Sequence, residues 1–257
     1  MKFSANLGFL WADRPLPEAI HAAHKAGFDA VECHWPYDTP AMDVARALGE
    51  TGLLMLGLNT KRGDLAKGEN GLSALPGREE DARAAIDQAI TYARAINAQN
   101  IHVMAGFATG PLAAAVFVEN LAYACDQAAP FGITILIEPL NRHDAPGYFL
   151  TTTDQAQEII KSVGAANLKL MFDCYHVQRM QGDLSHRLAA LLPLIGHIQF
   201  ASVPDRGAPD HGEVNYTYIF ALIADLGYSA PLGAEYKPAL DTDATLGWLA
   251  AYRPKPR

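Results

Sequence analysis

The sequence predicts an α/β protein that folds as one eight-stranded (β/α)8 barrel, the TIM-barrel class, over residues 1–257. Eight short apolar runs alternate with longer segments rich in Ala and Leu, which is typical of buried parallel strands joined by helices. The length of 257 residues matches this fold, which has about 250 residues. A doubly wound open sheet, the competing fold, would carry G-x-G-x-x-G after its first strand, and this chain lacks that motif there.

The expected strands are near-continuous apolar runs, consistent with burial on both faces. In order they are 2–7, 29–33, 53–58, 100–104, 133–138, 168–173, 197–201 and 231–235.

Three helices between these strands are especially clear. Over 79–96, Ala and Ile recur at helical spacing and form one apolar stripe. A second helix over 112–129 stops at Pro130, which breaks helices. A third, over 155–163, is expected to be capped by Thr153 and Asp154. No composition shift or linker divides the chain, so we expect a single domain.

Composition and charge disfavour several classes of protein. Half of the residues are apolar, 19% are charged and the mean hydropathy is near zero, unlike a disordered or membrane protein. The longest apolar runs, 132–137 and 188–195, are too short to span a bilayer. A net charge of −8 disfavours nucleic acid as a partner. The start of the chain lacks the apolar core of a signal peptide, and three cysteines fit reduced thiols, so we expect a cytoplasmic protein.

Polar residues occupy the ends of the late strands, where this fold places its active site. Glu138, Asp173 and Glu235 end apolar runs, Gln199 lies within one, and His176 follows three residues after Asp173. The earlier strands add Asn6, Glu32, His34, Asn59 and His102.

Each of these residues also has an ordinary structural interpretation. A single acid at a strand end is commonly a loop cap, and His102 by itself is more typical of a packed, hydrogen-bonded histidine. We expect Glu32 to hold the second loop through an internal hydrogen bond. The cysteines Cys33 and Cys174 are expected to fill apolar space, with Cys174 facing away from Asp173 if the strand continues.

The four late residues are harder to explain separately, because they would converge at the barrel mouth. Three unpaired buried carboxylates would repel one another and cost several kcal/mol. A divalent cation removes this cost, so Glu138, Asp173, Gln199 and Glu235 predict a metal site. Oxygen ligands suit Mg²⁺ or Mn²⁺ rather than zinc, which favours His and Cys.

Several longer segments resemble the hydroxypyruvate isomerase family, which belongs to the xylose-isomerase-like barrels. They are FDAVECHWPY (28–37), GLSALPGRE (71–79), IHVMAG (101–106), IEPLN (137–141), FDCYHVQRMQGDL (172–184), HIQFASVPDRGAPDHGEVNY (197–216) and GAEYKP (233–238). The resemblance runs essentially from end to end. It implies an isomerase of small hydroxy-oxo acids with a metal held by the four residues above. It further implies that Glu138 and Glu235 are the acid/base pair and that His176 lies beside the substrate.

The expected reaction interconverts hydroxypyruvate and tartronate semialdehyde through an enediolate, whose charge the metal would stabilise. A sister group, the 2-oxo-tetronate isomerases, acts on four-carbon sugar acids. Segments 71–79 and 101–106 are more similar to that group, whereas 137–141 followed by 146–150 is more similar to hydroxypyruvate isomerase. The substrate therefore stays open between the two.

Two other functional classes rank lower. Endonuclease IV-type repair enzymes share the superfamily, but they use three zinc ions, more His ligands and a basic surface. This chain has Gln199 where a His would be expected and a net charge of −8. A non-catalytic sugar-acid binding protein would not require the paired glutamates. The expected partner is a small-molecule hydroxy-oxo acid without nucleic acid or membrane, and a homo-oligomer is left open.

An anionic substrate requires a cation near the metal, because the three acidic ligands sum to −3 against +2 for the ion. Loop cations that could serve are Lys61, Arg62, Arg206 and Lys237. Arg206 is the first choice, because arginine binds carboxylates through two parallel hydrogen bonds, and Glu213 is expected to position it. The full expected substrate-binding set is His176, Arg206, Lys237, Asn6 and His102.

Overall fold

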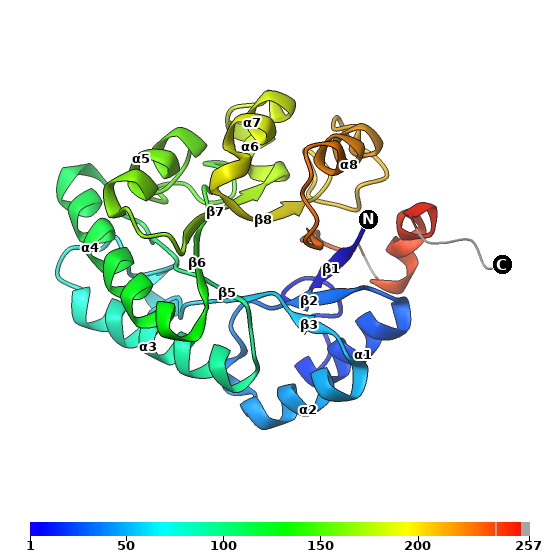
Figure 1. Cartoon of the computed structure of the whole chain (residues 1–257), viewed down its shortest axis with the longest axis horizontal. Helices are drawn as coiled ribbons and strands as arrows, with labels where there is room; N and C mark the ends of the chain where they lie inside the picture. Colours follow the sequence, from blue (N-terminus) through cyan, green and yellow to red (C-terminus); the bar gives the residue numbers. More distant parts are fainter. Residues whose placement is uncertain (240, 253–257) are drawn as a thin grey trace.

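A parallel sheet rolled into a barrel forms the centre of the computed structural model, which describes residues 1–239 and 241–252 (Figure 1). The strand order is β3-β2-β1-β9-β8-β7-β6-β5-β4, and every pairing is parallel. The strands are β1 Phe3–Asn6, β2 Ala30–Glu32, β3 Leu54–Met55, β4 Gly57–Asn59, β5 Asn100–His102, β6 Thr134–Ile137, β7 Leu168–Asp173, β8 Ile195–Phe200 and β9 Leu232–Ala234.

One segment closes the barrel. The strand expected over 53–58 is divided into β3, which pairs with β2, and β4, which pairs with β5. Between them the Leu56 amide still donates to the Val31 carbonyl at 2.7 Å, so the division is slight. Because β3 and β4 are the two ends of the strand order, this segment joins them, and the predicted barrel is confirmed.

Helices surround the barrel (Figure 1). They are α1 Leu16–Ala26, α2 Ala41–Thr51, α3 Glu79–Ala95, α4 Gly110–Ala128, α5 Thr153–Val163, α6 Cys174–Met180, α7 Leu184–Leu191 and α8 Tyr216–Asp225. Short 3₁₀ segments are η1 Pro36–Asp38, η2 Leu65–Lys67, η3 Ala129–Phe131, η4 Leu192–Leu194 and η5 Asp243–Tyr252. Within the described residues, no helix is long and apolar enough to cross a membrane.

The three clear helix predictions are confirmed: α3 begins at the predicted residue, and α4 and α5 each begin two residues earlier than predicted. Helix α4 begins two residues before the predicted start, because a proline such as Pro111 is tolerated in a first turn. The predicted cap of α5 was wrong. Thr153 is already helical, and the Thr152 hydroxyl accepts from the Gln155 amide at 3.2 Å.

Alternation along the strands decides which side chains face the barrel interior. On β1, Phe3 packs edge-on against Phe220 and Trp248 outside the sheet, with ring centroids 5.4 and 5.1 Å away. Asn6, three positions on, points the other way and contacts Glu235. All three cysteines are buried and free, as expected.

Candidate active site

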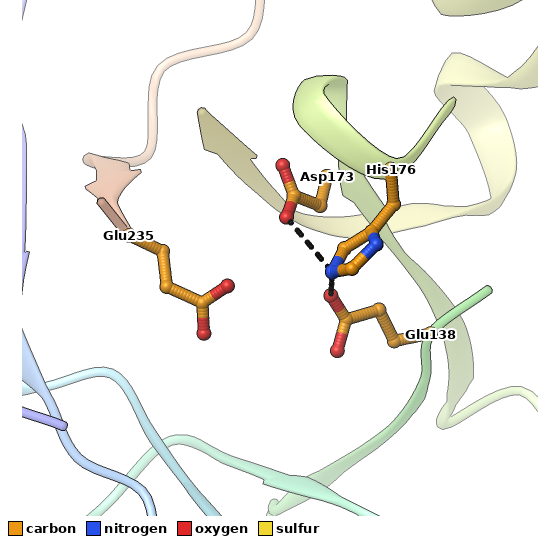
Figure 2. A group of neighbouring side chains, drawn as sticks. All are labelled: Glu138, Asp173, His176 and Glu235. Atoms are coloured by element: carbon orange, nitrogen blue, oxygen red, sulfur yellow. Dashed lines mark ion pairs between the residues drawn. The ribbon is translucent and has the colours of Figure 1, made fainter. Parts of the chain in front are cut away.

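Four buried side chains meet where the strands end: Glu138, Asp173, His176 and Glu235 (Figure 2). Each offers a ligand atom, and these atoms all lie within 4.8 Å of one another. Glu138 follows β6, Asp173 ends β7, His176 lies in the first turn of α6, and Glu235 follows β9. The structure thus brings together the three predicted carboxylates and the predicted histidine, and we call this group the carboxylate cluster.

Asp173 is oriented by the helix that begins after it. Its Oδ1 accepts from the Tyr175 amide at 2.8 Å and so caps α6. Its Oδ2 is buried without a hydrogen-bond partner. The cap therefore leaves the second oxygen facing the cluster, 3.6 Å from His176 Nε2.

His176 is held from behind by the loop after β6. Its Nδ1 accepts from the Asn141 amide at 3.0 Å, which assigns the proton of a neutral ring to Nε2. Burial, and next the nearby charge of Arg206, lower the pKa of His176 to about 3, so the ring is neutral. In this tautomer Nε2 carries a proton and so is not a metal ligand; it lies 3.6 Å from Asp173 Oδ2 and 3.8 Å from Glu138 Oε1, without a hydrogen bond to either.

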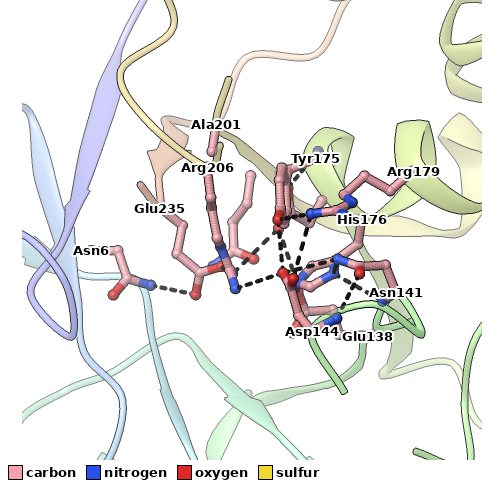
Figure 3. Close-up of polar contacts among 12 residues, drawn as sticks. Asn6, Glu138, Asn141, Asp144, Tyr175, His176, Arg179, Ala201, Arg206 and Glu235 are labelled. Atoms are coloured by element: carbon pink, nitrogen blue, oxygen red, sulfur yellow. Dashed lines mark hydrogen bonds and ion pairs between the residues drawn. The ribbon is translucent and has the colours of Figure 1, made fainter. Parts of the chain in front are cut away.

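Glu235 is held by three neighbours. Asn6 Nδ2 donates to Oε1 at 3.0 Å, and Arg206 donates to Oε2 (Figure 3). His34 Nε2 lies 3.0 Å from Oε1. Burial by itself raises the pKa of Glu235, but the charge of Arg206 and the hydrogen bond of His34 outweigh it and lower the pKa to about 2.

His34 was missing from the predicted substrate-binding set, although it lies two residues after the end of β2. Its ring lies against the backbone of Gly8, where an added Cβ would be only 2.1 Å from Nδ1. The ring of Phe9 packs edge-on against it at 5.2 Å. Gly8, two residues past the end of β1, was the available signal in the sequence. Only the fold shows that this glycine makes room for the His34 ring.

Arg206 is the predicted cation that reaches the carboxylate cluster. Its guanidinium lies 4.8 and 5.0 Å from the ring centroids of Phe9 and Tyr175, and 3.8 Å from Asp173 Oδ2. The expectation that Glu213 positions it was wrong. Glu213 is exposed and accepts from Gln178 at 3.1 Å, because it lies on the outer part of the loop.

The other predicted cations lie elsewhere. The side chains of Lys61 and Lys237 are exposed, and the Lys237 amide donates to the Arg206 carbonyl at 2.8 Å. Arg62 donates to Asn70 at 2.8 Å and stacks on Trp35. A role for Lys237 in substrate binding therefore stays a prediction.

His102 lies next to Glu138, and its Nδ1 is 3.5 Å from Glu138 Oε2. Burial lowers the pKa of His102 to about 4, so this ring too is neutral. Its buried Nε2 has no hydrogen-bond partner within the described residues.

Glu32 lies inside the barrel, and the expectation that it holds the second loop was wrong. It is in register with Asn6 on β1 and faces inward, so it reaches β8 instead. Its Oε2 lies 2.6 Å from His197 Nε2, and its Oε1 accepts from Gln199 Nε2 at 3.4 Å. Gln199 is in register with Asp173 on one side and Gly233 on the other.

The donor atoms fit a divalent cation. Glu138 Oε1, Asp173 Oδ2 and Gln199 Oε1 are buried oxygens without hydrogen-bond partners. Burial, and next the charge of Glu235, raise the pKa of Glu138 well above its usual value and that of Asp173 to about 7. Uncompensated acids of this kind are expected where a cation binds.

Comparisons with known proteins agree with this geometry. A family model described as "Xylose isomerase-like TIM barrel" matches residues 20–252. The chain is 46% identical to the 2-oxo-tetronate isomerase of Cupriavidus necator, over 98% of each chain. It is 40% identical to the hydroxypyruvate isomerase of Escherichia coli, over 98% of this chain and 100% of that protein.

Solved structures show the same fold. A Brucella melitensis protein named "AP endonuclease, family 2" is 39% identical, with a TM-score of 0.95 over 98% of this chain and 99% of the other. A D-psicose 3-epimerase shares the fold at 19% identity, with a TM-score of 0.78 over 96% and 89% of the two chains. The full-length identity to the two isomerases, together with the buried acid cluster, shows that this chain is an isomerase of the hydroxypyruvate isomerase and 2-oxo-tetronate isomerase family, within the xylose isomerase-like TIM barrels.

Proposed function

We propose that this protein moves a carbonyl group between carbons 2 and 3 of a short 2-oxo acid, with 2-oxo-tetronate as the first candidate substrate. The carboxylate cluster carries the proposal, because it sets two glutamates around one buried point at the strand ends. The 46% identity to a 2-oxo-tetronate isomerase favours the four-carbon acid. The 40% identity to a hydroxypyruvate isomerase supports hydroxypyruvate as the second candidate.

The reaction requires a base and an acid near two adjacent carbons. One glutamate removes the proton from the hydroxyl-bearing carbon, and an enediolate results. A proton is then returned to the former carbonyl carbon, and the hydroxyl proton passes from the first oxygen to the former carbonyl oxygen, so the carbonyl group has changed carbons. Glu138 follows β6 and Glu235 follows β9, with β7 and β8 between them, so the two carboxylates can flank a substrate. Their roles as the acid/base pair are part of this proposal.

Glu138, Asp173, Gln199 and Glu235 would hold a Mg²⁺ or Mn²⁺ ion. When bound, the ion supplies Lewis-acid stabilisation of the negative charge on the two substrate oxygens. The Nε2 of His176 lies beside this point, 3.6 Å from Asp173 Oδ2, where its proton can be donated to a bound substrate, and Asn6 keeps one oxygen of Glu235 in place.

Arg206 would bind the substrate carboxylate. Its side chain is only 12% exposed and stacks between Phe9 and Tyr175, so these rings shield the charged groups from water. A planar guanidinium matches a carboxylate through two parallel hydrogen bonds. Neutral hydroxyketones, which lack the carboxylate, would then be poor substrates.

A turnover screen tests the proposal. Chelator-stripped protein is given 2-oxo-tetronate or hydroxypyruvate with Mg²⁺ or Mn²⁺, and the substrate and product are followed by ¹H NMR. We expect turnover of at least one acid, faster with 2-oxo-tetronate, and lost again when chelator is added. Turnover of neither acid would overturn the proposed reaction. Full activity in rigorously metal-free protein would overturn the role of the ion.

The same preparation also tests for endonuclease activity, because the Brucella protein is named as an endonuclease. A net charge of −8 leads us to expect no shift of duplex DNA in a gel at low salt. A salt-sensitive shift together with DNA cleavage would favour that function instead.

A further inference from the structure

Glu32, His197 and Gln199 form a second buried polar group inside the barrel, here called the Glu32 network. Their side chains come from β2 and β8, two strands that are separated by β1 and β9 in the sheet. Glu32 Oε2 lies 2.6 Å from His197 Nε2, and Glu32 Oε1 lies 3.4 Å from Gln199 Nε2. All three residues are at most 4% exposed. The proposed reaction uses Gln199 but assigns nothing to Glu32 or His197.

Gly233 on β9 makes room for the Glu32 network. A Cβ at this position would lie 2.3 Å from Glu32 Oε1 and 2.8 Å from both Gln199 Cγ and His197 Nε2. Real Cβ atoms do not approach other atoms so closely, so all three side chains pack directly on the glycine. The Glu32 network is therefore held by packing against Gly233 as well as by its hydrogen bonds.

The chemistry of Glu32 decides how the Gln199 amide is turned. A carboxylate only accepts hydrogen bonds, so Gln199 must present its NH₂ group to Glu32. The amide is planar, and its oxygen therefore faces away from Glu32. This oxygen is buried and has no partner among the described residues.

We propose that Glu32, itself held by His197, is a positioning residue that turns the Gln199 amide oxygen toward the divalent cation. The proposal rests on the metal ligands assigned above. It adds that a bound metal depends on a carboxylate that does not touch it. Residues that orient a ligand in this way typically change metal affinity by about 10- to 100-fold when replaced.

A water molecule is the alternative partner for the Gln199 oxygen. A small cavity of about 10 Å³ adjoins the network and is lined by Asn6, Glu32, Asn59, His102 and Gln199, among others. That volume suits about one water. If such a water donated a hydrogen bond to the Gln199 oxygen, replacing Glu32 would leave metal binding unchanged. Measuring the Mn²⁺ affinity of a Glu32 variant distinguishes the two cases.

Glu32→Gln is the primary variant, because it keeps the shape of the side chain. His197 would keep its short contact with the carbonyl oxygen of the new amide. The NH₂ group of residue 32 would then face Gln199. Gln199 would then turn its own oxygen inward and its NH₂ toward the metal. We expect Mn²⁺ affinity to fall by roughly 10- to 100-fold.

A charge swap provides the rescue. In Glu32→Gln/Gln199→Glu, residue 199 has an oxygen on both sides, so it can accept from residue 32 and still face the metal. The total charge is unchanged. We expect this double variant to recover most of the Mn²⁺ affinity that Glu32→Gln loses. Gln199→Glu alone is the reference, because a fourth carboxylate ligand can raise Mn²⁺ affinity by itself. In that background Glu32→Gln should cost little affinity, whereas simple damage to packing would cost the same in both backgrounds.

Mn²⁺ binding to chelator-stripped protein is measured by calorimetry and by the electron paramagnetic resonance signal of the free ion. Circular dichroism melting of the stripped proteins reports folding separately. Glu213→Gln is the matched control, because it removes a carboxylate that is exposed and bonded to Gln178, and we expect no change.

The outcomes separate this inference from the proposed function. If the wild type binds no Mn²⁺, the metal site itself fails. If the wild type binds and Glu32→Gln binds equally well, the positioning role of Glu32 is overturned. If Glu32→Gln does not fold, the charge swap decides: binding near the wild-type affinity supports the role, and weak binding by a folded double variant overturns it.

Discussion

Each carboxylate of the site divides its two oxygens between different neighbours. Asp173 Oδ1 accepts a hydrogen bond from the Tyr175 amide at the start of α6, and Oδ2 has no hydrogen-bond partner among the described residues. Glu138 has Oε2 near His102 and Oε1 without a partner. Glu235 accepts from Asn6 with Oε1 and from Arg206 with Oε2. A carboxylate fixed through one oxygen cannot rotate freely, so Asp173 and Glu138 present their remaining oxygens to a substrate or metal in a defined orientation.

The two glutamates are therefore expected to be individually essential. Glu138→Gln and Glu235→Gln keep the shape and one oxygen but remove the base. General acid–base catalysis contributes roughly 10²- to 10⁴-fold, so each variant should lose at least about 10²-fold in kcat. The double variant should be little worse than either single one, because residues that work as a unit are non-additive. Steady-state kinetics measure these losses, and circular dichroism checks the fold.

Running the reaction in D₂O tests the same pair from the substrate side. We expect deuterium on the carbon that receives the proton, to the extent that the carboxyl proton exchanges with solvent. A hydride shift would place none there. Near-normal turnover of Glu138→Gln without any solvent deuterium would contradict the proton transfer and favour the hydride route.

Arg206→Ala should weaken kcat/KM by the contribution of a charged hydrogen bond, about 1.5–3 kcal/mol. Because the guanidinium also donates to Glu235, the variant removes a partner of the proposed base as well as a substrate contact. Arg46→Ala is the matched control, since Arg46 pairs only with Asp43 among the described residues and is largely exposed. Unchanged kinetics in Arg206→Ala would move the carboxylate contact to another cation.

At the scale of elements, the loop after β8 is built to hold Arg206. The Arg206 amide donates to the Ser202 carbonyl at 3.0 Å, and the Ser202 amide donates to the Gly207 carbonyl at 2.9 Å. These bonds form a tight turn in which Arg206 adopts a φ of +58°, in the left-handed region. The backbone thus aims the guanidinium inward at the cost of a conformation that few non-glycine residues adopt.

The same loop contains a surface pair whose titration can be measured. Hydrogen bonds to Asp205 and then Asp210 raise the pKa of His211. Partial burial raises the pKa of Asp205, but hydrogen bonds from His211 and Ser202 outweigh it and lower the pKa to about 2. The histidine contribution to stability is present below its ordinary pKa and lost as pH rises through the raised one. The aspartate contribution is lost as pH falls toward 2.

We therefore expect NMR titration of the His211 imidazole to give a pKa above the ordinary value of about 6.5. Asp205→Asn should lower that pKa, since it removes the first of the two acceptor charges. A His211 pKa unaffected by Asp205→Asn would show that the pair is not formed in solution.

The sequence could predict the residues that end strands, because parallel strands all end at one edge of the sheet. Glu138, Asp173 and Glu235 were found in this way. It could not predict contacts made across the barrel, such as Glu32 with His197, because these depend on strand order and register rather than on spacing along the chain. The capping Thr152 was missed because Thr153 and Asp154 are equally good cap residues.

At the scale of the whole molecule, the site lies within the barrel rather than in an open surface hollow. A hollow of about 520 Å³ beside α3 is lined by Lys61, Asp64, Arg78 and Gln88, among others, and contains no member of the carboxylate cluster. Arg206 contacts Glu235 and Asp173 of the cluster, and its guanidinium stacks on the rings of Phe9 and Tyr175. The chemistry of the donor atoms, rather than the size of a pocket, therefore locates the site.

Because β1 pairs with β9, the site cannot form until the ribosome has synthesised β9. Asn6 and Glu235 are 229 residues apart. A ribosome adds about 5–20 residues per second, so Asn6 waits roughly 11–46 seconds for its partner to be made. During this interval β1 lacks one of its two neighbours, and its unpaired edge can attract other chains. Nascent chains stalled before β9 would therefore be inactive and would depend on chaperones to stay unaggregated.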